Sequence, residues 1–476
     1  MRIDEAYNEL HARHTEATAR KDMDAIADVS SRYDELLNSV PDELGLLFSC
    51  GTAHMQLGHN GLAIALYEKA LRIKDLPEIW NNLGTAYKSE NMNDKARECW
   101  ERALALREDA DYYNNMATLY INEGKPTEGL VWAERGLELS GEHPRLRWNH
   151  ALLLLELGRW REGFAEYEYG IQSMDRHERF YSNPTDLIPM WDGSKGKRVV
   201  VYGEQGIGDE IMFASAIPDL MRDCEVVFEC HPRMVGLFSR SLGVQCYGTR
   251  KEATLAWPKY EKLDARLPIG SLFRFYRSNG EFPKVPYLKA DPKLVRHYRK
   301  RLESLGPGPY VGIGWRAGTK STRDDLRSLK LKSFNGVMDI GGTFVSLQYT
   351  EDASGKVHRY REQTGRVVHH WPDVVESGEK ENRNKGFDYD HTVALIEALD
   401  LCILPNTAAV HVCGALGKEC WTITPSAPAW RYQLEGEQMP VYESVRQFRG
   451  GDAIERITEE YRNRWARTEP VIQAAG

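Results

Sequence analysis

The chain has 476 residues, too many for one compact core, so we expect two to four domains. Its 42% hydrophobic and 28% charged residues are typical of a globular protein, and no apolar run is long enough to form a membrane-spanning helix. The N-terminus lacks the apolar segment of a secretory signal, which predicts a cytoplasmic protein. The net charge of −8 disfavours broad binding to nucleic acid or anionic membranes, but leaves room for a local basic patch.

The cysteine and histidine patterns point away from disulfides and metals. The 8 cysteines include no C-x-x-C pair and mostly lie in apolar contexts such as "LDLCILP", which predicts buried, reduced thiols. The 14 histidines include no H-E-x-x-H pattern. The sequence therefore predicts no metal site.

The first third of the chain repeats with a period of 33–34 residues. Small residues recur at two positions of each repeat: Gly51, Gly84, Ala117 and Ala151, and Ala70, Ala103, Gly136 and Gly170. Small residues at fixed places let paired helices approach closely, and the pattern resembles tetratricopeptide repeats. We assign four repeats to about residues 43–175 and a capping helical pair to residues 1–40, within a helical domain of residues 1–182.

Asparagines recur two residues before the first small position, at Asn82, Asn115 and Asn149. A similar ladder in protein O-linked N-acetylglucosamine transferases holds extended peptide backbone, so one interpretation is a peptide-binding concave face. The other interpretation is a row of solvated polar side chains.

The pattern of apolar residues changes after a proline- and glycine-containing linker near residues 183–197. Short apolar strands alternate there with helical stretches: "RVVVYG", "EVVFEC", "YVGIGW", "TFVSLQ", "DLCILP" and "CWTIT". This alternation predicts parallel sheets covered on both faces, in two α/β domains at residues 196–300 and 307–455 separated by the linker "LESLGPGP". We expect the last helix, "AIERITEEYRNRWARTE", to pack back on these domains.

The stretch "VVVYGEQGIGDEIMF" places a glycine-rich turn at the carboxyl end of a strand, where ligands bind in open α/β sheets. Gly206 and Gly208 would let the backbone approach a ligand, and a helix beginning near Asp209 would offer free N–H groups. No Lys-Ser/Thr pair follows, which excludes a P-loop. Asp209 fits a helix N-cap as well as a catalytic carboxylate.

The second α/β domain contains a matching turn. In "LPNTAAVHVCGALG", Asn406 and Thr407 suit a helix N-cap, and Ala408 and Ala409 leave backbone N–H groups accessible to a diphosphate. The stretch "GWRAGTKSTRDDLRSLKL" supplies cations that could neutralise phosphate, or that form a solvated basic loop: Arg316, Lys320, Arg323 and Arg327.

Together these motifs, with "FVSLQYT", "APAWRY" and "VRQFRGGD", resemble the tetratricopeptide-fused members of glycosyltransferase family nine, the family of ADP-heptose:lipopolysaccharide heptosyltransferases. The resemblance covers about residues 183–460. It implies a GT-B fold, with an acceptor domain at residues 183–306 and a nucleotide-sugar donor domain at residues 307–476. It also implies an inverting, metal-independent reaction in which the nucleoside diphosphate sugar is a co-substrate and no cofactor is needed.

The resemblance assigns roles to particular residues. Asp209 matches the general base, and Arg327 is the cation expected at the leaving diphosphate. The turn implied to contact the acceptor comprises Glu204, Gln205, Gly206 and Gly208. The residues implied to contact the donor are Arg316, Lys320, Arg327, Gln348, Tyr349, Asn406, Thr407, Ala408, Ala409 and His411.

One assigned residue departs from the family pattern, and two residues, His411 and Arg431, carry alternatives. Asn406 stands where the family has Asp, which keeps the hydrogen-bonding capacity but removes a charge. His411 either faces the diphosphate or packs against the sheet, and Arg431 either borders the sugar pocket or packs within the domain.

The resulting hypothesis is a glycosyltransferase whose repeats select a protein or glycan acceptor. A catalytically inactive binding scaffold is the first alternative, suggested by Asn406. Sugar transfer to a hydroxymethylated DNA base is the second, and the acidic net charge disfavours it.

Overall fold

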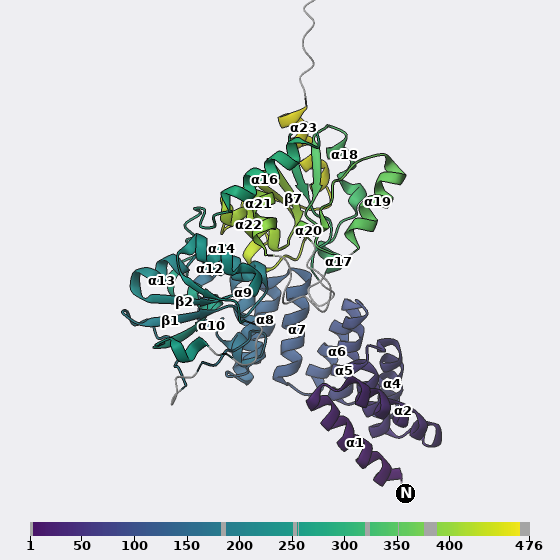
Figure 1. The fold of residues 1–476 in the computed structure, drawn as a ribbon. Coiled ribbons are helices and arrows are strands. Elements are labelled where there is room, and N and C mark those ends of the chain that lie inside the picture. The colour runs from purple at the N-terminus through teal and green to yellow at the C-terminus, as the bar shows by residue number, and fades with distance from the viewer. Residues whose placement is uncertain are drawn as a thin grey trace, which may run out of the picture. The chain divides into compact units, whose positions relative to one another are not determined.

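The computed structural model describes residues 3–181, 187–250, 255, 257–318, 324–350, 352–375 and 388–466. The chain divides into two compact units, Met1–Leu153 and Leu154–Gly476. Figure 1 shows helices in the first unit and a mixture of strands and helices in the second. The fold is thus a helical repeat region followed by parallel α/β structure, as the sequence predicts.

The first unit consists of consecutive helices that pack in antiparallel pairs, α1 with α2, α3 with α4, α5 with α6 and α7 with α8. Their bounds are α1 Ile3–Arg20, α2 Met23–Ser39, α3 Leu44–Gln56, α4 Asn60–Ile73, α5 Pro77–Ser89, α6 Asn93–Leu106, α7 Ala110–Glu123, α8 Pro126–Leu139 and α9 Pro144–Glu156, which runs on into the second unit.

The recurring small residues are the points where one helix of a pair lies against a large side chain of the other. A Cβ atom added to Gly84 would lie 2.8 Å from Trp100 Nε1, and one added to Gly51 would lie 2.8 Å from the Tyr67 ring. Both aromatic rings are buried. At Gly51 and Gly84 the repeat period therefore reflects the packing of an aromatic ring against a glycine.

Two of the recurring asparagines, Asn115 and Asn149, bond to asparagines of the preceding repeat. The side-chain amide of Asn115 donates to Asn81 Oδ1 over 2.8 Å. Asn149 is 9% exposed, and its amide donates to Asn114 Oδ1 over 2.8 Å and to Thr118 Oγ1 over 2.9 Å. The side-chain amides of Asn115 and Asn149 thus connect the first helices of neighbouring repeats, and a peptide-binding role of this row stays a prediction.

The second unit contains two parallel sheets, with strand orders β3-β2-β1-β4 and β6-β5-β7-β8-β9. The first sheet comprises β1 Arg198–Tyr202, β2 Glu225–Glu229, β3 Gln245–Tyr247 and β4 Ala265–Pro268. The second comprises β5 Tyr310–Ile313, β6 Thr343–Ser346, β7 Leu401–Pro405, β8 Cys420–Thr424 and β9 Val445–Arg449. The strands β1 and β7 lie inside their sheets, with buried residues throughout β7 and from the second residue of β1.

Helices cover both sheets. Before and around the first sheet lie α10 Trp160–Glu166, α11 Tyr169–Gln172, α12 Ile207–Ala214, α13 Ile217–Asp223, α14 Val235–Leu242, α15 Leu272–Tyr276 and the connecting α16 Pro292–Glu303. Around the second lie α17 Asp324–Arg327, α18 Asn335–Met338, α19 Ala353–Thr364, α20 Pro372–Val375, α21 Asp390–Ala398, α22 Ala408–Leu416 and α23 Ala453–Trp465.

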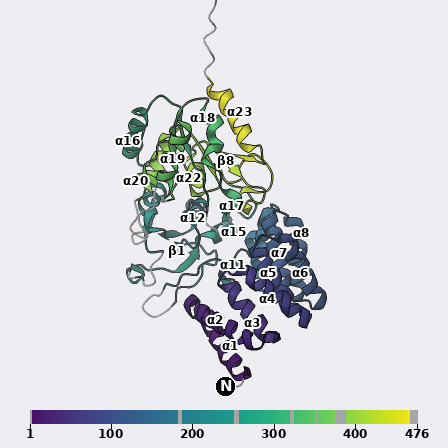
Figure 2. The ribbon, with the colours of Figure 1, turned by 90° about the vertical axis from the view of Figure 1, so that its right-hand side faces the viewer.

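The last helix, α23, packs against β8, β9 and α18 through its buried residues Ile457 and Tyr461. Figure 2 shows it in yellow along the outside of the second sheet domain. Among the helices of the described residues, none is both long and apolar enough to cross a membrane.

Candidate functional site

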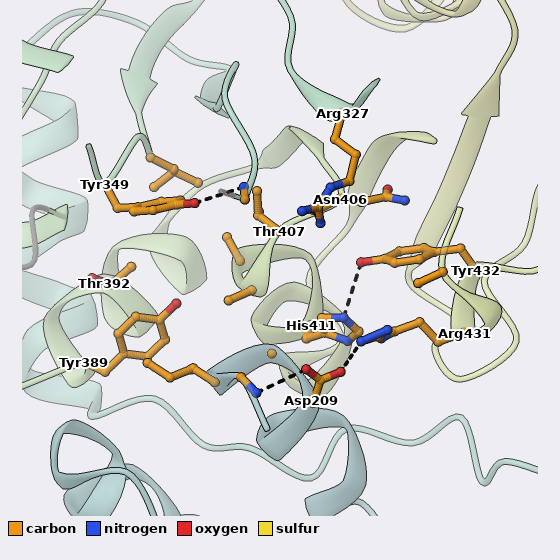
Figure 3. Close-up of a pocket in the computed structure, with 18 of the residues that line it drawn as sticks. Asp209, Arg327, Tyr349, Tyr389, Thr392, Asn406, Thr407, His411, Arg431 and Tyr432 are labelled. Atoms are coloured by element: carbon orange, nitrogen blue, oxygen red, sulfur yellow. Dashed lines mark hydrogen bonds and ion pairs between the residues drawn. The ribbon is translucent and has the colours of Figure 1, made fainter. Parts of the chain in front are cut away.

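A pocket of about 570 Å³ lies where the two sheets face each other, a volume typical of small-molecule sites. On one side β1 ends and a turn leads into α12, whose N-cap is Gly206. On the other side β7 ends and leads into α22, whose N-cap is Thr407. Both turns follow the carboxyl ends of parallel strands, and both line the pocket (Figure 3).

The two helices meet at Gly208. A Cβ atom added there would lie 3.0 Å from His411 Cδ2 and 3.2 Å from the Cα of Ala408. These distances are shorter than ordinary carbon contacts. The second glycine of the turn therefore lets α12 and α22 approach, which brings Asp209 of one sheet domain beside the helix N-terminus of the other.

Asp209 lies on the pocket wall and forms an ion pair with Arg431 through Oδ1, and each side chain is 17% exposed. Its Oδ2 accepts the N–H of Gly206 over 3.3 Å. Asp209 is thus in the first turn of α12 and is not its N-cap, because the helix begins at Ile207. Burial lowers the pKa of Arg431, but the Asp209 carboxylate, together with Tyr432 and Tyr167, outweighs that effect, so the pKa of Arg431 is raised.

His411 also lines the pocket, between two tyrosine hydroxyl groups. Its Nε2 lies 3.3 Å from the hydroxyl of Tyr432, and its Nδ1 lies 3.3 Å from that of Tyr442. Burial, and then the nearby charge of Arg431, hold the pKa of His411 well below its usual value. The imidazole is therefore neutral at physiological pH and acts as a hydrogen-bonding group.

Arg327 and Asn406 lie together beside the start of α22 (Figure 3). The guanidinium of Arg327 donates to the backbone oxygen of Asn406 over 3.3 Å. Asn406 is 2% exposed, and its Oδ1 accepts hydrogen bonds from Thr422 over 2.8 Å and Thr424 over 3.3 Å. The side chain is thus held against β8 and does not cap α22, contrary to one expectation.

The first turn of α22, with Thr407, Ala408 and Ala409, faces the pocket. Within the described part of the chain, no side chain caps this helix. The N–H groups of its first turn and the positive end of its dipole are therefore oriented to bind a negatively charged ligand.

Two expected donor contacts differ in their surroundings. Tyr349 lines the pocket, and its hydroxyl accepts the N–H of Gly318 over 3.2 Å. Gln348 is buried away from the pocket, and its Oε1 accepts the N–H groups of Trp315 over 3.1 Å and Arg316 over 2.9 Å. Gln348 therefore fixes the backbone that follows β5. Arg316 is not among the lining residues.

Lys320, with Arg323, lies outside the described residues.

The first part of the glycine-rich turn has a structural role instead of lining the pocket. Glu204 is buried and forms an ion pair with Arg176, at 2.8 Å. Its Oε1 also accepts the N–H of Gly270 over 3.2 Å. Gln205 donates to the hydroxyl of Tyr167 over 2.9 Å. Neither Glu204 nor Gln205 lines the pocket, since their side chains bond to residues behind the turn, and their role as acceptor contacts stays a prediction.

Several lining residues were not singled out from the sequence. Arg233 follows β2, and its guanidinium lies 5.3 Å from the centre of the Tyr389 ring. Tyr389 and Thr392 also line the pocket, at the start of α21. The position of Arg233 soon after a parallel strand is the signal that could have identified it.

The charges of the described lining residues favour an anion. Arg233, Arg327 and Arg431 bring three positive charges, against one carboxylate, that of Asp209. The helix N-termini of α12 and α22 add partial positive charge. The arrangement can bind a phosphate-bearing ligand and hold a carboxylate close to it.

The comparisons with known proteins concern mainly the repeats. Family descriptions of the tetratricopeptide repeat match residues 45–75 and 77–109, which confirms the repeat prediction. Protein FlbA of Caulobacter vibrioides is 30% identical over 337 residues, covering 66% of this chain and 52% of FlbA. The chain thus spans about half the length of this curated relative.

The chain is similar to several solved structures, and some of these are described as tetratricopeptide repeat proteins. The MamA protein is 18% identical, with a TM-score of 0.30, and covers 36% of this chain and 93% of its own. Pseudomonas aeruginosa pilF is 18% identical, with a TM-score of 0.32, and covers 36% and 78%. YrrB, a TPR protein with an unusual peptide-binding site, is 18% identical, with a TM-score of 0.26, and covers 29% and 73%. The resemblance of residues 183–460 to glycosyltransferase family nine stays a prediction.

Proposed function

We propose that this protein is a glycosyltransferase that moves a sugar from a nucleoside diphosphate to an acceptor hydroxyl group. The observation that supports this most is the pocket between the two sheets, where Asp209 faces Arg327 and the start of α22. Two parallel-sheet domains with a site at their facing strand ends are what the GT-B interpretation requires.

On the donor side, the diphosphate would lie at the N-terminus of α22. The N–H groups near Thr407 and Ala408 would bind its oxygens, and Arg327 would neutralise its charge. These contacts strengthen as the phosphate departs from the sugar, and removing one such group typically lowers the rate about 10²–10³-fold.

On the acceptor side, Asp209 would accept the proton of the attacking hydroxyl. The acceptor oxygen then forms a bond to the anomeric carbon while the bond from that carbon to the phosphate oxygen breaks. The nucleoside diphosphate leaves with the electron pair of that bond, so the displacement is single and inverting. A general base of this kind contributes about 10²–10⁴-fold to the rate.

The ion pair of Asp209 with Arg431 sets a condition on this step. Arg431 engages Oδ1, and the N–H of Gly206 engages Oδ2, so about two of the four lone-pair positions of the carboxylate are occupied before a substrate binds. Arg431 also lines the pocket. A bound diphosphate would attract its guanidinium away from Asp209, and the carboxylate would then accept the acceptor proton.

Protein binding is the role that the tetratricopeptide repeats support directly. We propose that the repeat unit binds a protein that carries the acceptor hydroxyl. A protein-binding scaffold without catalysis is the second candidate. It is favoured by Asn406, whose side-chain oxygen accepts hydrogen bonds from Thr422 and Thr424 and so is not directed at a sugar nucleotide.

A nucleotide panel followed by turnover separates the two candidates. Thermal unfolding is measured with UDP, GDP, ADP, their sugars and the nucleoside monophosphates, because a ligand that binds the folded state raises its melting temperature. Release of nucleotide from the stabilising sugar donor is then measured for the native protein and for Asp209→Asn. The proposal expects stabilisation by at least one donor and a loss of about 10²–10⁴-fold in the variant.

Undiminished turnover in Asp209→Asn contradicts the assigned base, and the absence of both stabilisation and turnover favours the scaffold. Plain and hydroxymethylated DNA serve as additional acceptors in the same assay.

A further inference from the structure

In the first unit, Met1–Leu153, three side chains bring metal-binding atoms together between α2 and α3. Cys50 and His54 are one helical turn apart on α3, so they share a face of the helix. Asp34 of α2 lies opposite them. Its Oδ1 is 3.1 Å from His54 Nε2 and 3.3 Å from Cys50 Sγ, and the three ligand atoms all lie within 4.8 Å of one another.

The two distances from Asp34 are close to those of a tetrahedral metal site. Zinc binds thiolate, imidazole and carboxylate ligands at about 2.0–2.3 Å, which places neighbouring ligand atoms about 3.3–3.6 Å apart. The two contacts of Asp34 need to lengthen by only a few tenths of an ångström to admit an ion. We propose that Asp34, Cys50 and His54 form a site for Zn²⁺, with a fourth position open to water. This site is independent of the proposed sugar transfer.

The surroundings suit such a site. His54 is buried, and its Nδ1 lies 3.3 Å from His59 Nδ1, so a partner is available to orient the ring while Nε2 binds the ion. Ser30 Oγ lies 3.3 Å from both ring nitrogens. Cys50 is fully buried, whereas the side chain of Asp34 is 48% exposed and provides the route by which an ion enters from solvent.

Without the ion, Oδ1 of Asp34 accepts a hydrogen bond from the thiol of Cys50 and lies within hydrogen-bonding distance of His54. An incoming Zn²⁺ takes the place of these hydrogens. The Cys50 sulfur loses its proton to solvent and binds as a thiolate, while His54 carries its one N–H on Nδ1 and binds through Nε2. Burial raises the pKa of the Cys50 thiol, so the thiolate forms together with metal binding. Each ion therefore releases one proton.

Cobalt titration of the full-length protein, after removal of any histidine tag, tests the site. Co²⁺ bound by a thiolate produces a sulfur-to-cobalt absorption band in the near ultraviolet. We expect the band to saturate at one equivalent, to disappear when Zn²⁺ is added, and to be accompanied by release of one proton per ion. Affinity should fall about tenfold for each unit that the pH decreases, because one proton competes with the ion.

The matched variants are Cys50→Ser, which should lose the band, and Cys99→Ser, which should retain it because Cys99 lies on α6, outside the cluster. Asp34→Asn keeps the side-chain shape at a half-exposed position, so it remains folded even if the change at Cys50 does not. It should weaken Co²⁺ binding at least tenfold. A band that persists in Cys50→Ser, an unchanged affinity in Asp34→Asn, or no band at one equivalent in the native protein each overturns the proposal.

Discussion

Replacing Asp209 by Asn should tighten the binding of nucleoside diphosphate while it abolishes most of the turnover. In the native protein Arg431 forms an ion pair with the Asp209 carboxylate and also lines the pocket. The carboxylate therefore competes with a bound anion for the guanidinium group. Asparagine has nearly the same shape but no charge. The change therefore removes a competitor for Arg431 and a repulsion toward phosphate.

The magnitude follows from the charges. Two like charges about 6 Å apart repel by about 3 kcal/mol at an effective dielectric constant of about 20. If solvent screening halves this value, about 1.4 kcal/mol remains, which is a tenfold decrease in Kd. Without ligand the variant should be less stable than the native protein, because Arg431 is 17% exposed and loses its counter-ion. Its melting temperature should then rise further than that of the native protein when the nucleotide is added.

Isothermal titration with the nucleoside diphosphate identified in the panel measures the affinity. Asp219→Asn is the matched control, because Asp219 forms a similarly buried ion pair with Arg277, their side chains being 14% and 7% exposed, outside the pocket. This control should lower stability and leave the affinity unchanged. A Kd in Asp209→Asn that is equal to or weaker than that of the native protein would refute the reasoning about Arg431.

Three further changes test other parts of the structure. Gly208→Ala places a methyl group 3.0 Å from His411 Cδ2, so we expect a loss of about 1–3 kcal/mol in thermal stability and weaker nucleotide binding; Gly355→Ala, whose added Cβ meets only a side-chain end at 3.6 Å, should be neutral. His411 is neutral in the folded protein but becomes protonated in the unfolded chain below about pH 6.5. The free energy of unfolding should therefore fall as the pH decreases, by up to about 1.4 kcal/mol per pH unit. His411→Gln should reduce this pH dependence, measured by thermal unfolding between pH 5 and 7. Asn149→Ala should lower the free energy of unfolding, measured in urea, by about 1–2 kcal/mol, since it removes a buried amide between helices. An unchanged free energy of unfolding would favour the open peptide-binding ladder instead.

The repeats were readable from the sequence because their spacing is itself a packing rule. A small residue recurs at the position of Gly84, where the Trp100 ring packs against the backbone, so the spacing of these residues along the chain indicates contacts between helices. The strand β4 was missed for the opposite reason. Its Arg266 is buried, and the guanidinium donates to the backbone oxygens of Ile188 and Arg179, both over 2.9 Å. A charged residue whose burial depends on distant backbone atoms gives no apolar pattern, and the short β3 and the alternating β9 were missed as well.

Within the site, the sequence located the turns but not the direction of each side chain. Gln348 and Tyr349 are neighbours, yet one faces the backbone after β5 and the other faces the pocket. The same holds for Gln205 and Asp209 in the glycine-rich turn. Which residue of a turn faces a ligand depends on contacts from other elements, such as Tyr167 behind the turn, and these have no local signature.

The engagement of both Asp209 oxygens has a kinetic consequence. If the guanidinium of Arg431 leaves the carboxylate only when a phosphate arrives, the acceptor meets a competent base only in a donor-loaded protein. Substrates would then add in a compulsory order, with the nucleotide sugar first. Product nucleotide would compete with the sugar donor, but a rising acceptor concentration would not displace it.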